Sequence, residues 1–276
     1  MSAQKPRRVV IGNHKGGAGK TAYTVNTAAA VAALGRRVLV VDLDPQANAS
    51  RRLGFRWDPA EPVPTISEAI KADARGVAAD AISPCQWEQE IGERIDLIPS
   101  RFDLENRISE AGVVGAVWRL RKALEGVDDD YDLVLLDCPP SLGHLTQLAL
   151  AAGHVAVCTV EPEYDSVEGA VRFRDFIAQR AGDVGNPGLS LIGYVVSRVR
   201  SNVGAHAYQL DGLPELFGDR LWSPNVPERA PVKDAGDAAI PLRALGRSNA
   251  TEMAFIFQEL AKRLLAELGQ PVSDPA

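Results

Sequence analysis

The sequence predicts an α/β fold in which a mostly parallel, twisted sheet lies between two layers of helices. Apolar runs of strand length recur along the chain, and helical stretches separate most of them, as in strand–helix–strand units. These runs are almost continuous in Val, Ile and Leu, so helices should cover both faces of the sheet. We expect a three-layer αβα arrangement as a single domain over residues 1–276, with residues 1–7 and 269–276 as flexible tails.

The N-terminal elements surround a glycine-rich turn. Arg8–Asn13 is typical of an apolar strand, and the alanine-rich segment Ala22–Leu34 is typical of a helix. The next apolar run, Arg37–Leu43, predicts a second buried strand. A proline-rich surface loop at Gly54–Pro64 and a helix at Thr65–Ala72 should follow.

The remaining elements alternate in the same way. The expected strands are Ile95–Pro99, Tyr131–Cys138, His154–Val160 and Leu191–Val196, and the expected helices are Glu105–Leu124, Leu142–Ala151, Ser166–Arg180 and Asn249–Leu268. The last helix carries an apolar stripe formed by Phe255, Ile256, Leu260, Leu264, Leu265 and Leu268. Because few basic residues flank this stripe, we expect it to pack on the sheet rather than on a membrane.

Composition excludes several classes of protein. A chain of 276 residues with 46% apolar content can form a full hydrophobic core. No apolar run approaches the ~20 residues that span a bilayer, and the N-terminus lacks the apolar stretch of a secretion signal, so we expect a cytoplasmic protein. Cys85, Cys138 and Cys158 show no metal-binding spacing and are expected in the core. With a net charge of −6, nucleic-acid binding would require a local basic patch.

The segment between the first strand and the first helix predicts a phosphate-binding loop. Its glycines allow successive backbone N–H groups to point at a phosphate, and the N-terminus of the helix adds unpaired N–H groups of its own. Lys20 is expected to reach the β- and γ-phosphates of ATP, and the Thr21 hydroxyl is placed to bind Mg²⁺. The expected nucleotide-binding residues here are Lys15, Gly16, Gly17, Ala18, Gly19, Lys20, Thr21 and Ala22.

Two buried strands end in carboxylates, at Asp42 and Asp137. In open parallel sheets ligands bind outside the carboxyl ends of the strands, so one crevice can collect both aspartates and the loop. A carboxylate at the tip of an apolar strand needs a cation, and we expect Asp42 and Asp137, with Thr21, to hold Mg²⁺ or its bound water. Asp44 lies further out and is the candidate catalytic residue that orients the attacking water.

The loop resembles the deviant Walker A group of P-loop ATPases, whose pattern K-G-G-x-G-K-T is matched by Lys15–Thr21. His14 stands where the ordinary loop has glycine. In that group the first lysine reaches across a dimer interface to the partner's nucleotide, so the resemblance gives Lys15 a catalytic role alongside Lys20. Asp44–Asn48 and Asp137–Leu142 resemble the two switch segments of the ParA/Soj-type plasmid and chromosome partition ATPases, in their short form without an N-terminal helix-turn-helix.

The resemblance implies an ATPase that uses ATP and Mg²⁺ and forms a homodimer with the nucleotides sandwiched between its subunits. It further implies non-specific binding of double-stranded DNA, association with the nucleoid, and slow hydrolysis stimulated by a ParB-type centromere-binding partner, without membrane attachment. The expected DNA-binding residues are Arg200, Arg229, Lys233, Arg243 and Arg247, and the expected adenine contacts include Pro224 and Asn225, with Ser197 and Arg198 beside them.

Two positions depart from the family pattern. Ala22 replaces a second hydroxyl residue that supports the α-phosphate, which implies a modest affinity for nucleotide. Pro227 stands where the short members often carry a DNA-contacting arginine.

Three further functions are compatible with these residues. A ParA-like ATPase that positions another cargo would share every residue named above. A MinD-like ATPase would act at the membrane through its C-terminal helix. A metabolic enzyme of the same loop class would be an iron–sulfur reductase, which needs paired cysteines at a subunit interface, or a carboxylate-activating synthetase, which needs a small-molecule pocket.

Overall fold

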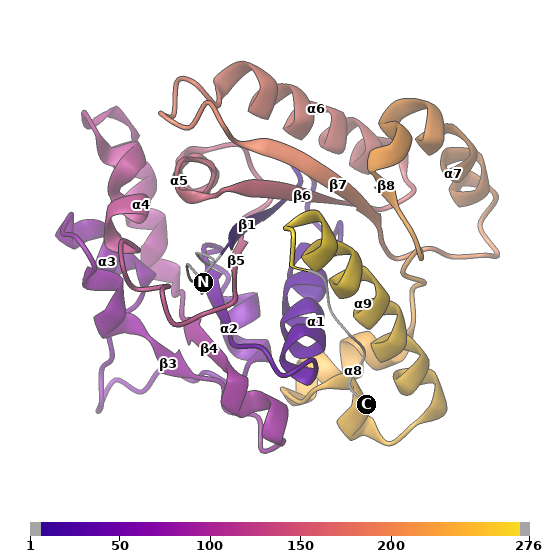
Figure 1. Cartoon of the computed structure of the whole chain (residues 1–276), viewed down its shortest axis with the longest axis horizontal. Helices are drawn as coiled ribbons and strands as arrows, with labels where there is room; N and C mark the ends of the chain where they lie inside the picture. The colour runs from indigo at the N-terminus through magenta and orange to yellow at the C-terminus, as the bar shows by residue number, and fades with distance from the viewer. Residues whose placement is uncertain (1–6, 271–276) are drawn as a thin grey trace.

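The computed structural model describes residues 7–270 and contains one eight-stranded sheet (Figure 1). Its order is β3-β4-β2-β5-β1-β6-β7-β8, and only the β3–β4 pair is antiparallel among the pairs described. The strands are β1 Arg7–Gly12, β2 Val38–Asp42, β3 Ser83–Pro84, β4 Ile95–Ile98, β5 Leu133–Asp137, β6 Val155–Val160, β7 Ser190–Val196 and β8 Leu221–Trp222. The predicted mostly parallel sheet is confirmed.

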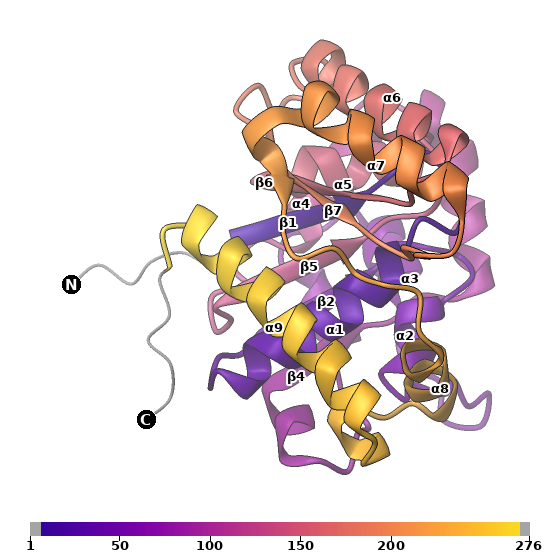
Figure 2. The same cartoon turned by 90° about the vertical axis from the view of Figure 1, so that its right-hand side faces the viewer.

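Helices cover both faces of this sheet (Figure 2). They are α1 Lys20–Ala33, α2 Asn48–Arg52, α3 Ile66–Ala72, α4 Arg119–Ala123, α5 His144–Ala152, α6 Tyr164–Arg180, α7 Gly204–Phe217, α8 Ala230–Ala238 and α9 Ser248–Glu267. In β1, Val9 and Ile11 join the apolar cluster under α1 and α9, while Val10 joins the cluster under α5 and α6. This alternation of apolar side chains across a strand confirms the three-layer arrangement.

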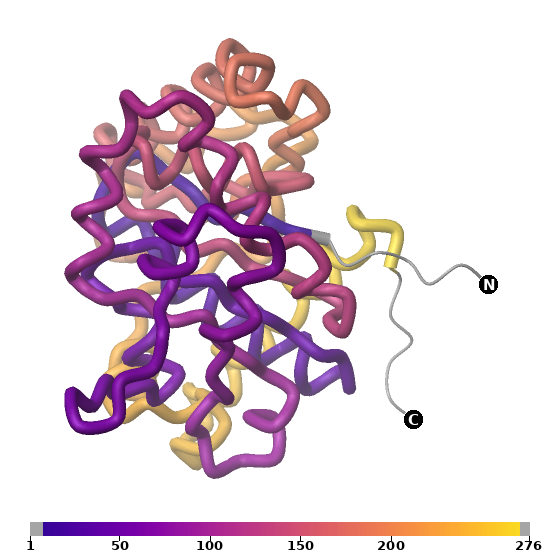
Figure 3. Tube along the Cα trace, turned by 90° about the vertical axis from the view of Figure 1, so that its left-hand side faces the viewer, coloured from indigo at the N-terminus to yellow at the C-terminus, as the bar shows by residue number. Residues whose placement is uncertain are grey.

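The C-terminal helix α9 packs against α1 and the sheet, as predicted. Leu260, Leu264 and Leu265 of its apolar stripe are fully buried, whereas Phe255 is 57% exposed and does not share in this packing. The start of β1 and the end of α9 lie on the same side of the molecule (Figure 3). Within residues 7–270 no helix has the length and apolarity needed to cross a bilayer.

The expected tails fall partly outside the described residues, which exclude 1–6 and 271–276. Arg7 already belongs to β1. Gln270 is buried, accepts a hydrogen bond from Arg36 at 2.8 Å and donates one to the Asp132 carbonyl at 3.2 Å, so the end of α9 is held past Gly269.

The helix predicted over Glu105–Leu124 is wrong. The chain forms 3₁₀ turns at Phe102–Gly112 and Ala116–Trp118 before the short helix α4. Val113 is extended and Gly115 has φ +79°, so the glycines of this segment end the helical backbone where the sequence pattern suggested continuity. The two-residue strands β3 and β8 and the helices α2, α7 and α8 were not predicted.

Candidate functional site

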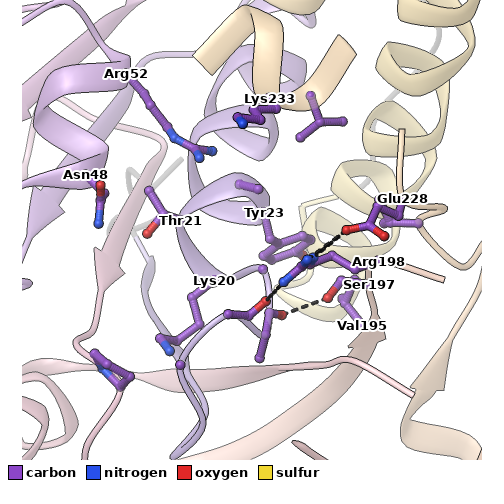
Figure 4. Close-up of a pocket in the computed structure, with 18 of the residues that line it drawn as sticks. Lys20, Thr21, Tyr23, Asn48, Arg52, Val195, Ser197, Arg198, Glu228 and Lys233 are labelled. Atoms are coloured by element: carbon purple, nitrogen blue, oxygen red, sulfur yellow. Dashed lines mark hydrogen bonds and ion pairs between the residues drawn. The ribbon is translucent and has the colours of Figure 1, made fainter. Parts of the chain in front are cut away.

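A cavity of about 500 Å³ opens beside the glycine-rich turn, at the carboxyl ends of the strands (Figure 4). The titratable side chains that line it include Lys20, Asp44, Arg52, Arg198, Glu228, Arg229 and Lys233. Five of these are cationic and two are anionic, in a chain whose net charge is −6. This local excess of positive charge suits an anionic ligand.

Residues that follow β7 hold the glycine-rich turn through hydrogen bonds to its backbone carbonyls. Ser197 Oγ donates a hydrogen bond to the Ala18 carbonyl at 2.7 Å, and Arg198 Nη1 donates one to the Gly17 carbonyl at 3.0 Å. Gly19 has φ +82°, and a Cβ there would lie 2.7 Å from Ser197 Oγ. Only glycine therefore fits at this position, because both the backbone conformation and the space exclude a side chain.

The two lysines of the turn have different surroundings. Lys20 is buried, and its Nζ donates a hydrogen bond to the Lys15 carbonyl at 3.1 Å, closing the turn. Burial lowers the pKa of Lys20, and the nearby charges of Asp137 and Asp44 act in the opposite direction. Lys15 instead points away from the turn toward α6, where its Nζ lies 3.2 Å from Asp165 Oδ2 with 42% of the side chain exposed.

Hydroxyl groups of α1 hold Asp137 at the end of β5. Thr21 Oγ1 and Thr24 Oγ1 each donate a hydrogen bond of 2.7 Å to a different oxygen of its carboxylate. Burial is the main cause that raises the pKa of Asp137, and these hydrogen bonds counteract it.

Asp42 is the register partner of Asp137 on the neighbouring strand. It accepts hydrogen bonds from Ser50 N at 2.8 Å, from Ser50 Oγ at 2.7 Å and from Asp44 N at 3.1 Å. Its pKa is raised, first by burial and then by the charge of Asp137. The two adjacent carboxylates and the hydroxyl groups around them offer oxygen atoms as metal ligands, which fits the preference of Mg²⁺ for oxygen.

Asp44 lines the cavity two residues after Asp42. Its Oδ1 accepts a hydrogen bond from the backbone N–H of Gln46 at 2.9 Å, which fixes the carboxylate in a turn just after the carboxyl end of β2. The structure thus brings the loop, Asp44 and the Thr21–Asp137 pair together at one edge of the sheet, and the roles of these residues stay predictions.

The residues predicted to bind DNA have different surroundings, and their contact with DNA stays a prediction. Arg229 and Lys233 line the cavity. Arg243 donates a hydrogen bond to Gln258 at 3.1 Å, and Arg247 pairs with Asp234 at 2.8 Å.

Arg200 lies in an internal network of charged groups. Its Nη2 donates a hydrogen bond of 2.5 Å to Glu163 and lies 3.0 Å from His206 Nε2, and its Nε lies 3.5 Å from Glu228. The guanidinium thus pairs with acidic groups of its own chain, and its contact with DNA stays a prediction.

Only some of the residues expected to contact adenine line the cavity. Ser197 and Arg198 line the cavity, whereas its lining continues through Val226 and Pro227 rather than Pro224 and Asn225. Their assignment to the base stays a prediction.

Sequence reasoning missed Arg52 and Glu228 as lining residues. Glu228 pairs with Arg198 at 2.7 Å. Arg52 is the last residue of α2, and this helix of five residues is too short to be predicted from a periodic sequence pattern.

The three cysteines are all free and buried, as predicted. Cys85 hydrogen-bonds the Leu53 carbonyl, and burial raises its pKa to about 11. Such thiols are poor metal ligands and poor nucleophiles, so an iron–sulfur reductase gains no support.

The family described as an AAA domain matches residues 6–189. The chromosome-partitioning ATPase Soj of Thermus thermophilus is 35% identical over 237 residues, which cover 85% of this chain and 86% of that protein. The sporulation initiation inhibitor protein Soj of Bacillus subtilis is 30% identical over 262 residues, which cover 94% of this chain and 98% of that protein.

Two solved structures are similar over nearly the whole chain. The ATP complex of a McdA variant from Cyanothece superposes with a TM-score of 0.83 at 22% identity and covers 99% of each chain, which shows a common fold. The cobyrinic acid a,c-diamide synthase of Mycobacterium smegmatis, with bound ADP and magnesium, has a TM-score of 0.76 at 27% identity and covers 98% of this chain and all of that one.

Proposed function

The chain belongs to the Soj/ParA family of partition ATPases, and from this premise we propose that it is a switch that dimerises around ATP. It is an ATPase, with ATP as substrate and Mg²⁺ as cofactor. The dimer binds double-stranded DNA without sequence preference and segregates plasmid or chromosomal DNA with a ParB-type partner that stimulates a slow hydrolysis. We place the protein in the cytoplasm, on the nucleoid while ATP is bound.

The outward position of Lys15 carries this proposal. Within its own chain the phosphate loop is closed by Lys20, and the Lys15 ammonium pairs with an exposed carboxylate of α6. An exposed ion pair of this kind contributes little, so the ammonium can exchange Asp165 for a phosphate held by a second subunit. ATP then favours the dimer because it binds that state more tightly than the monomer.

The other residues act within one subunit. The loop N–H groups and Lys20 hold the phosphates, and Thr21, Asp42 and Asp137 hold the metal or its bound water. Mg²⁺, when bound, supplies positive charge that neutralises the phosphate oxygens. Asp44 orients the water that attacks the terminal phosphate. Hydrolysis removes the charge that holds the two subunits together, and the dimer opens.

Sedimentation velocity tests the switch directly. The Asp44→Ala protein with saturating ATP and Mg²⁺ should sediment as a dimer, and with ADP as a monomer. A monomer under both conditions contradicts the proposal. Binding to two unrelated duplexes with ATP should be equal and should weaken steeply as salt rises. ATP-independent or salt-insensitive binding would count against DNA as the partner.

A synthase is the second candidate function, and the similarity to cobyrinic acid a,c-diamide synthase favours it. A synthase activates a carboxylate in the same cavity and does not need a DNA-bound dimer. Its ATP hydrolysis would depend on a small carboxylic acid, whereas the turnover of a partition ATPase would respond to DNA together with the partner protein.

A further inference from the structure

Arg52 reaches the cavity from the element that follows the first switch segment. It is the last residue of α2, and its backbone carbonyl accepts a hydrogen bond of 2.9 Å from Trp87 Nε1, which fixes the end of this short helix. Its side chain points into the pocket from the side opposite Lys20, with Lys233 nearby (Figure 4). Two cations thus lie across the cavity from the phosphate loop.

The Arg52 guanidinium lies against the backbone of α8. A Cβ at Gly236 would come within 3.1 Å of Arg52 Nε and 3.2 Å of its Cζ. Glycine in the interior of a helix costs about 1 kcal/mol relative to alanine. The space that Gly236 leaves is filled by the arginine, so α8 and α2 together hold the guanidinium at the cavity wall.

One N–H group of this guanidinium is buried without an acceptor. None of residues 7–270 accepts a hydrogen bond from Arg52 Nε. Burial lowers the pKa of Arg52, but an arginine keeps its charge in proteins. The Nε–H group is enclosed against α8, so the end of the guanidinium that points into the cavity is the part that oxygen acceptors of a ligand can reach.

We propose that Arg52 binds the phosphate groups of the nucleotide from the side of the cavity opposite the loop. The inference rests on the proposed function, because it takes the cavity as the ATP site. Guanidinium groups bind phosphate oxygens strongly, often through two parallel hydrogen bonds. In this role Arg52 compensates for the phosphate contact that is lost because Ala22 has no hydroxyl group, since both residues line the same cavity.

Nucleotide binding by the Arg52→Gln variant tests the proposal. Fluorescent mant-ATP and mant-ADP are titrated into wild-type protein and the variant with Mg²⁺, at protein concentrations where the wild type is monomeric. Loss of charge-assisted hydrogen bonds should weaken both affinities by about tenfold to a hundredfold. Arg51→Gln is the matched control, because Arg51 is the exposed neighbour of Arg52 and does not itself line the cavity. Wild-type affinity in Arg52→Gln overturns the proposal.

Gly236→Ala provides a second test that leaves Arg52 in the chain. The added methyl group should displace the guanidinium, so nucleotide affinity should fall at least about fivefold while the melting temperature without nucleotide stays the same or rises. Wild-type affinity in this variant overturns the assigned position. If wild-type protein itself binds no nucleotide, the ATP site of the proposed function fails. If nucleotide binds but no dimer forms, only the switch fails.

Discussion

Asp42 and Asp137 lie side by side as register partners on β2 and β5, with both carboxyl groups fully buried. Asp42 accepts hydrogen bonds from Ser50 and from the Asp44 backbone. Asp137 accepts hydrogen bonds from the hydroxyls of Thr21 and Thr24. Even so, burial raises the pKa of both groups, and the charge of Asp137 adds to the shift of Asp42. Without nucleotide the protein therefore keeps a costly pair of acids at the site that we assign to the metal.

Removing one of these charges should stabilise the protein and impair its chemistry. In Asp137→Asn the amide keeps an acceptor and a donor for the two threonine hydroxyls but cannot ionise. We expect the free energy of unfolding without nucleotide to rise by about 1–3 kcal/mol at neutral pH, measured by urea denaturation. ATP hydrolysis should fall by about a hundredfold or more. A less stable variant would show that the carboxylate contributes more through its hydrogen bonds than it costs.

The same pair predicts a pH dependence. A carboxyl group whose pKa is raised by folding favours the neutral form, so its contribution to stability is complete below about pH 4 and is lost as the pH rises toward neutrality. The stability gained in Asp137→Asn should therefore be near zero in acid and grow through this window. Magnesium binding requires the ionised form and should strengthen over the same range. Melting curves of both proteins at several pH values, with and without Mg²⁺, measure both trends; a pH-independent difference would contradict the assignment.

Lys15→Gln should separate nucleotide binding from dimerisation. Because the Lys15 ammonium faces Asp165 and not its own loop, the variant should bind mant-ATP within about threefold of wild type. It should remain a monomer under conditions where wild type sediments as a dimer. Lys20→Gln is the contrasting control, since its buried ammonium closes the loop and its loss should abolish binding itself. A dimeric Lys15→Gln protein would contradict the role in trans.

The sheet and the phosphate loop could be predicted because their signals are local. Runs such as Val38–Asp42 are apolar throughout, apart from the final aspartate, and the glycine spacing before Lys20 has a direct backbone cause. The break at Gly115 could not be predicted, because a glycine within a helical pattern is compatible with either outcome. The surroundings of Arg200 and Arg52 could not be predicted either. Whether an arginine meets carboxylates, as Arg200 does, or an open cavity, as Arg52 does, depends on contacts distant in sequence.

The exposed arginines near α8 and α9 should contribute to DNA binding by charge alone. Arg243 and Arg247 are exposed, and an exposed pair such as Arg247–Asp234 breaks readily in favour of a phosphate. Each lost phosphate contact should make the negative slope of log K against log salt less steep by about 0.9 per subunit. Fluorescence anisotropy of Arg243→Ala and Arg247→Ala with ATP measures this slope. Arg220→Ala, an exposed arginine outside the predicted DNA-binding residues, is the control; equal slopes in all proteins would exclude both residues from the interface.

Asp44→Ala should trap the dimer on DNA. The Asp44 carboxylate lines the cavity, and within residues 7–270 it accepts a hydrogen bond from the Gln46 N–H alone, whereas Asp42 keeps its two bonds from Ser50 without it. The metal site and the closed state should therefore form, while hydrolysis falls by about a hundredfold for lack of a group that orients water. After a chase with excess ADP, the variant should leave an immobilised duplex far more slowly than wild type. Asn48→Ala is the control, because it changes a neighbouring lining residue to which we assign no role in hydrolysis. Normal turnover in Asp44→Ala would remove Asp44 from the catalytic role, and rapid release despite blocked hydrolysis would separate DNA binding from the nucleotide state.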